Sequence, residues 1–84
     1  MKEPIIFKLP NVEGECHIIE KRGYTGKGYR YSLKFYIGDK EVYYCDSFKN
    51  NKSQINVNHL IVLATNHLIN MDVLENLDLY MEAR

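Results

Sequence analysis

The side chains best suited to chemistry are two cysteines and three histidines: Cys16, His17, Cys45, His59 and His67. Cys16 and His17 are adjacent in a predicted strand, so their side chains point to opposite faces. His59 and His67 share a predicted helix but lie about 80° apart around it and ~12 Å along it, too far to share an ion. The chain contains neither a Cys-x-x-Cys pair nor a His-x-x-x-His pair. We therefore expect no metal site and no cofactor.

Nucleophilic and acid–base catalysis have equally little support. Cys45 could act as a nucleophile, but no orienting group follows it at a recognisable spacing. No serine stands in a Gly-x-Ser-x-Gly elbow. Closely spaced carboxylates occur near the C-terminus, where Asp72, Glu75, Asp78 and Glu82 are typical of a solvated helix face with a capping role. The sequence therefore predicts a protein that is not an enzyme and has no catalytic residues.

A glycine-rich segment, residues 23–28, resembles a phosphate-binding loop only superficially. A Walker loop has four residues between its glycines and then Lys-Ser or Lys-Thr, whereas here two residues intervene and Gly28 follows Lys27. We predict a hairpin tip instead. Its backbone N–H groups and the Lys27 ammonium could still contact a phosphate without nucleotide specificity.

Charge is distributed unevenly along this neutral chain of 84 residues. The segment 21–52 holds eight of the eleven Lys and Arg residues but only three acids, and so carries about +5; the flanking segments are acidic. This asymmetry predicts one face that meets a partner. The length favours a single domain over residues 1–84. No apolar run reaches the ~20 residues of a membrane span, and the start lacks the apolar region of a secretory signal, so we expect a cytoplasmic protein.

The elements that must position these residues follow from hydrophobic periodicity. Alternation and turn residues predict strands over 5–9, 15–21, 29–37 and 41–48. Asn56 is a predicted N-cap for a helix that runs to about residue 69, and Asp72 with Glu75 resembles a capping box for a second helix. The expected fold is α+β, an antiparallel meander of three to four strands followed by two helices packed on one face. Cys16 and Cys45 then lie on strands that flank a central strand, too far apart for a disulfide, and are predicted to be free thiols.

Strict alternation also assigns side chains to the two faces of the sheet. Residues 29, 31, 33, 35 and 37 should face the helices. In the next strand, Val42, Tyr44 and Phe48 should share one side, and Tyr43, Cys45 and Ser47 the other. The opposite face and its loops then collect cations and phenols that could contact phosphates and bases. The predicted partner-binding residues are Lys21, Lys27, Arg30, Lys34, Tyr36, Lys40 and Tyr43.

Short motifs in residues 15–69 resemble the arm-binding domains of tyrosine integrases: the run 22–31 with its glycines and tyrosines, the Gly-Asp hairpin at 38–39, and Ser47-Phe48-Lys49 before a helix. Such domains lay a three-stranded sheet, backed by one helix, in the DNA major groove. The resemblance implies DNA binding with Arg30, Lys34 and Tyr36 on the groove-facing strand. The additional N-terminal strand and the acidic second helix are departures from that pattern.

Two other partners fit the same sequence. Small neutral chains rich in Lys, Asn, Ile and Tyr resemble accessory proteins of low-GC bacteria or their phages, which implies an inhibitor or adaptor that occludes a host protein complex such as a defence nuclease. Tyrosines would then serve as interface anchors. The predicted first helix is apolar over more than half its circumference, so a homodimer through the surface around Val62 and Ile69 is a further hypothesis.

Overall fold

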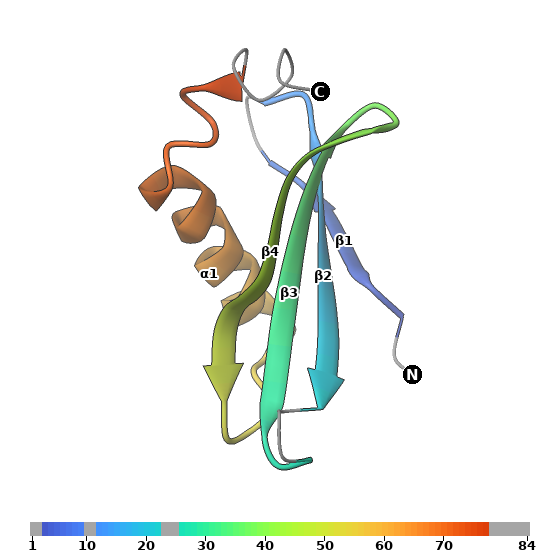
Figure 1. Ribbon diagram of the computed structural model, residues 1–84, viewed down its shortest axis with the longest axis vertical. Helices are drawn as coiled ribbons and strands as arrows, with labels where there is room; N and C mark the ends of the chain where they lie inside the picture. The colour runs from blue at the N-terminus through green and yellow to red at the C-terminus, as the bar shows by residue number, and fades with distance from the viewer. Residues whose placement is uncertain (1–2, 10–11, 23–25, 78–84) are drawn as a thin grey trace.

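A computed structural model describes residues 3–9, 12–22 and 26–77, which form an antiparallel sheet and a helix (Figure 1). The sheet order is β1-β2-β3-β4, so each strand pairs with its neighbour in the sequence. This arrangement confirms the predicted α+β fold and the four-stranded meander. The elements are β1 (Ile5–Lys8), β2 (Glu15–Arg22), β3 (Tyr29–Ile37), β4 (Lys40–Asn51) and α1 (Val57–Asn70).

The core lies between one face of the sheet and α1. Tyr31, Leu33 and Phe35 alternate along β3 and have no exposed surface, because this face of the strand packs under the helix. Helix α1 contributes three buried side chains at four-residue spacing, Leu60, Ala64 and Leu68. Burying each large apolar side chain contributes about 1.5–3 kcal/mol before the loss of chain entropy.

Asn56 caps the N-terminus of α1 as predicted. Its side-chain oxygen accepts a hydrogen bond from the backbone N–H of Asn58 at 2.9 Å, which satisfies one of the unpaired donors of the first turn. On the outer side of the helix, Val62 and Ile69 remain 54% and 53% exposed. The described residues therefore leave an apolar strip of α1 in contact with solvent.

The capping role predicted for Asp72 is wrong. Asp72 has a positive φ of 57°, and it ends α1 rather than starting a second helix. The N–H of Asp72 donates to the carbonyl of Ile69 and the N–H of Val73 to that of Leu68, the paired bonds of a Schellman motif. Val73 is buried in the core beside Leu68. Turns follow up to residue 76, so α1 is the one described helix, and residues 78–84 of the predicted second helix lie outside the described residues.

The face assignment predicted for β4 is also wrong at its centre. Tyr43 pairs with Phe35 and so faces the helix, whereas Tyr44 pairs with Lys34 and faces solvent. The reason is a register shift between Phe35 and Tyr36, which inserts Val42 as an extra residue and reverses the alternation that follows.

Both cysteines are free thiols on the strands that flank β3. Cys16 of β2 pairs with Phe35, and Cys45 of β4 pairs with Leu33. Burial raises the pKa of the Cys16 thiol to about 12. This cysteine therefore stays protonated near neutral pH and belongs to the core.

Candidate functional site

The face of the sheet that points away from α1 is here called the open face. The strand register places Lys21 beside Arg30 on this face, and Lys34 and Tyr36 lie on the same face of β3, four and six residues after Arg30. These four residues thus lie where the alternation predicts.

Two cations of the open face, Arg30 and Lys34, are paired with acids. The Arg30 guanidinium lies 3.8 Å from the Asp46 carboxylate, and the Lys34 ammonium lies 3.7 Å from the Glu41 carboxylate. Each acid comes from β4, across the strand pair. The open face is therefore locally balanced in charge rather than uniformly basic.

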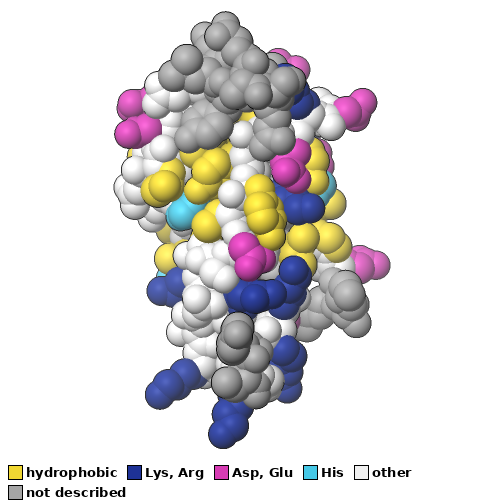
Figure 2. Space-filling model, in the orientation of Figure 1, with side chains coloured by type: hydrophobic (Ala, Val, Ile, Leu, Met, Phe, Trp, Pro, Cys, Tyr) yellow, Lys and Arg dark blue, Asp and Glu magenta, His cyan; other side chains and the backbone are white. Residues whose placement is uncertain are grey.

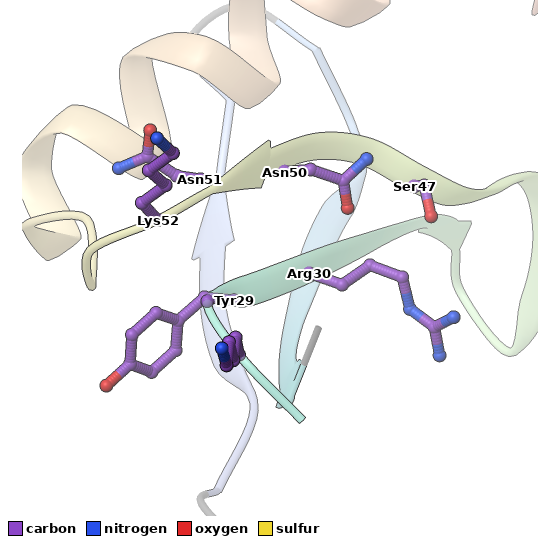
Figure 3. Close-up of a pocket in the computed structure, with 8 residues that line it drawn as sticks. Tyr29, Arg30, Ser47, Asn50, Asn51 and Lys52 are labelled. Carbon is purple, nitrogen blue, oxygen red and sulfur yellow. The ribbon is translucent and has the colours of Figure 1, made fainter. Parts of the chain in front are cut away.

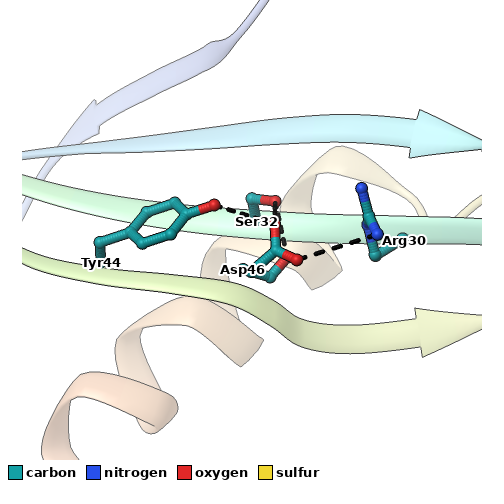
Figure 4. A network of polar contacts seen from close by, with 4 residues as sticks. All are labelled: Arg30, Ser32, Tyr44 and Asp46. Atoms are coloured by element: carbon teal, nitrogen blue, oxygen red, sulfur yellow. Dashed lines mark hydrogen bonds and ion pairs between the residues drawn. The ribbon is translucent and has the colours of Figure 1, made fainter.

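Asp46 is the centre of a polar network on this face (Figure 4). The Tyr44 hydroxyl donates to its Oδ1 at 2.9 Å, and the buried Ser32 hydroxyl donates to its backbone carbonyl at 2.6 Å. The hydrogen bond from Tyr44, followed by the charge of Arg30, lowers the pKa of the Asp46 carboxyl. Asp46 is thus held ionised, and it keeps a negative charge next to Arg30.

The remaining predicted residues do not join this face. Lys27 precedes the start of β3 and Lys40 pairs with its last residue, so about 30 Å of strand separates them. Tyr43 lies on the opposite side of the sheet, where its hydroxyl is 2.8 Å from Nε2 of His67 in α1. Burial lowers the pKa of that imidazole. The seven predicted residues therefore do not form one continuous patch.

A groove of about 650 Å³ opens at the end of the sheet where β3 begins and β4 ends (Figure 3). We call it the basic groove. Figure 3 shows Tyr29 and Arg30 pointing in different directions from the start of β3, with Asn50 and Asn51 on β4 opposite them. Its lining residues are Lys27, Gly28, Tyr29, Arg30, Ser47, Asn50, Asn51 and Lys52.

Backbone geometry brings the two walls of the groove together. Gly28 has a positive φ of 73°, and a Cβ atom at this position would lie 2.7 Å from the carbonyl oxygen of Asn51. Glycine therefore permits both the turn and the close approach to β4. Beyond β4, the N–H of Ile55 donates to the buried Tyr31 hydroxyl at 2.9 Å. This bond ties the segment that carries Lys52 to the core.

Among the described residues, the groove is lined by the cations Lys27, Arg30 and Lys52 and by no carboxylate. Figure 2 shows the same separation of charge on one face of the molecule: Lys and Arg side chains gather at the lower end, where β2 and β4 end, and most visible acids lie nearer the other end. Arg22 at the end of β2 extends the basic region, with its guanidinium 5.5 Å from the centre of the Tyr29 ring.

Sequence reasoning included Lys27 and Arg30 but missed the residues from β4. We expected the strand to end at Phe48, whereas it continues to Asn51 and pairs with the start of β3. The hairpin gave no signal for this extension, because the pairing of Ile37 with Lys40, continued without interruption, would place residue 48 opposite Tyr29. Two register shifts instead add three residues to β4, so that Asn51 pairs with Tyr29.

Two further observations bear on the site. Within residues 3–9, 12–22 and 26–77, no three His, Cys, Asp or Glu side chains cluster as metal ligands would, and no helix has the length and apolar character of a membrane span. Comparison with protein-family models, curated proteins and solved structures finds no match to this chain.

Proposed function

We propose that this chain is a non-enzymatic protein that binds nucleic acid through the basic groove. The observation that carries the proposal is the lining itself: three cations, a tyrosine and two asparagines surround a recess to which the described part of the chain contributes no carboxylate. Cations supply the electrostatic attraction to phosphates. Amide and aromatic side chains are suited to bases and sugars.

The charge balance of the open face favours the groove over that face as the contact. A phosphate that approached Lys34 would also approach Glu41, and one that approached Arg30 would also approach Asp46. The groove adds Lys27 and Lys52, for which no ion pair is found among the described residues. The resemblance to integrase arm-binding domains implies the other arrangement, with DNA against β3. Variants at the two places separate these alternatives.

The test is a titration of fluorescently labelled single-stranded and duplex oligonucleotides, followed by anisotropy at low salt. Lys27→Glu with Lys52→Glu reverses charge in the groove. The matched control, Lys34→Glu with Lys40→Glu, makes the same change in net charge on the open face and at the far hairpin. We expect the first pair to abolish measurable binding and the second to weaken it severalfold at most.

Equal losses in the two variants would contradict the groove assignment and indicate a general electrostatic effect. A larger loss in the control pair would support contact through the open face. No binding by the wild-type protein at low salt would reject nucleic-acid binding altogether.

A second candidate function, occlusion of a host protein complex, is favoured by a different surface. Val57, Val62, Ile69 and Met71, all on or just after α1, are each at least half exposed, and exposed apolar strips are characteristic of protein contacts. Affinity capture from host extract, compared between the wild type and Val62→Asp with Ile69→Asp, tests it. The result would count against this surface if no protein were captured in stoichiometric amount, or if the wild type and the double variant captured the same protein equally.

A further inference from the structure

We infer that the basic groove selects single-stranded nucleic acid, with one base stacked on Tyr29. The inference rests on the proposed function, because it specifies the ligand of the same groove. Its first support is size. The groove holds about 650 Å³, within the range of pockets that enclose a small organic ligand. An unstacked nucleotide fits such a recess, whereas a base inside a duplex cannot enter it.

The second support is the environment of the Tyr29 ring. The ring lines the groove at the start of β3, and the Arg22 guanidinium lies 5.5 Å from its centre. This cation–π contact, together with packing against the core cluster, restrains the ring. A restrained aromatic ring beside cations is the arrangement with which proteins hold single strands, since every base offers a face for stacking.

The third support is the uncharged polar lining. Asn51 lines the groove, and its amide nitrogen donates to the carbonyl of Ser53 at 2.8 Å, which leaves its side-chain oxygen as an acceptor without a hydrogen bond among the described residues. Asn50 has no side-chain hydrogen bond among the described residues, and Ser47 adds a hydroxyl near Arg30 (Figure 3). Side chains that both donate and accept can pair with base edges exposed by a single strand.

Three oligonucleotides of equal length test the inference with the unmodified protein: a single strand, the same strand with abasic sites, and the duplex. The abasic strand keeps every phosphate and removes the bases, so it isolates stacking from charge. We expect the intact single strand to bind at least about fivefold more tightly than either of the others. Single-stranded RNA and DNA are compared in parallel to identify the preferred sugar.

Variants of Tyr29 assign the effect to the ring. Tyr29→Leu keeps apolar volume and should remove the preference for the intact strand over the abasic strand, whereas Tyr29→Phe should retain it. Tyr29→Trp adds a unique fluorophore to a chain that has no tryptophan, and its emission should be quenched by the intact strand but not by the abasic strand. Circular dichroism checks that each variant is folded.

Equal binding of the intact and abasic strands, or tighter binding of the duplex, would overturn the inference. If the intact and abasic strands bound equally and the double variant Lys27→Glu with Lys52→Glu bound neither, nucleic-acid binding by the groove would stand and the stacking role of Tyr29 would fail. Absence of binding to all three oligonucleotides would reject both proposals together.

Discussion

Removal of one buried hydroxyl tests how the fold holds the basic groove. The Tyr31 hydroxyl accepts the hydrogen bond from the Ile55 N–H at 2.9 Å, and Ile55 itself is only 8% exposed. Tyr31→Phe keeps the ring and leaves no large cavity, but it leaves this N–H without its partner. An unsatisfied buried donor costs about 1–3 kcal/mol. In a domain of this size, each kcal/mol lowers the melting temperature by about 4–8 °C.

The measurement is urea unfolding followed by circular dichroism, with Tyr36→Phe as the matched control. The Tyr36 hydroxyl lies on the open face and makes no hydrogen bond among the described residues, so its removal should change the free energy of unfolding by less than about 0.5 kcal/mol. Hydrogen exchange of the Ile55 amide should also accelerate in Tyr31→Phe relative to the amides of β3. Equal stability of the two variants would refute the role assigned to this bond.

Three other perturbations have expected outcomes. Gly28→Ala should lower the free energy of unfolding by more than the ~1–2 kcal/mol that a left-handed alanine costs, because its Cβ would also meet the backbone of β4. Gly26→Ala is the control and should cost only the left-handed penalty, since Gly26 has a positive φ but no atom within 4 Å of an added Cβ. Equal losses of the two variants in urea unfolding would contradict this. Burial lowers the pKa of His67 in the folded protein, so the imidazole of the unfolded chain is protonated at a higher pH than that of the folded chain. The melting temperature should therefore fall as the pH drops below about 6.5. If a His67→Gln variant showed the same dependence of melting temperature on pH, His67 would be excluded as the cause. Light scattering should give twice the 9.9 kDa monomer mass if the exposed Val62 and Ile69 form a dimer, and the monomer mass after both are changed to Asp; a wild-type monomer would remove that hypothesis.

The local hydrophobic pattern of the sequence was sufficient to predict the sheet order and the first helix. The alternation of buried residues in β3 is set by one continuous strand, and the Asn56 cap depends on residues two positions apart. Both are short-range properties that single-sequence periodicity detects. The end of α1 was predicted to within one residue, but the role of Asp72 was not. Asp72 with Glu75 three residues later fits a capping box, whereas its positive φ and the burial of Val73 make it part of the turn that ends α1.

The site required long-range information. The bulge at Val42 is a register shift between two strands, and it places Tyr43 on the face opposite to the predicted one, where its hydroxyl contacts His67. The pairing of Arg30 with Asp46 joins residues on different strands. The groove likewise depends on Lys27 and Lys52, which line the same recess because β4 extends to pair with Tyr29 at the start of β3. Composition located the basic segment but not the place where its charge remains unbalanced.

The most direct test of nucleic-acid binding in the groove is the salt dependence of the binding constant for a single-stranded oligonucleotide. Because Asp46 already compensates the charge of Arg30, Lys27 and Lys52 are the groove cations expected to neutralise one phosphate each, which predicts a slope of about −1.4 for log K against log salt. Replacing Lys27 and Lys52 by Ala should bring the slope close to zero, whereas Lys34→Ala should leave it at about −1.4. A slope that the double variant does not change, or one that Lys34→Ala reduces as much, would contradict the account.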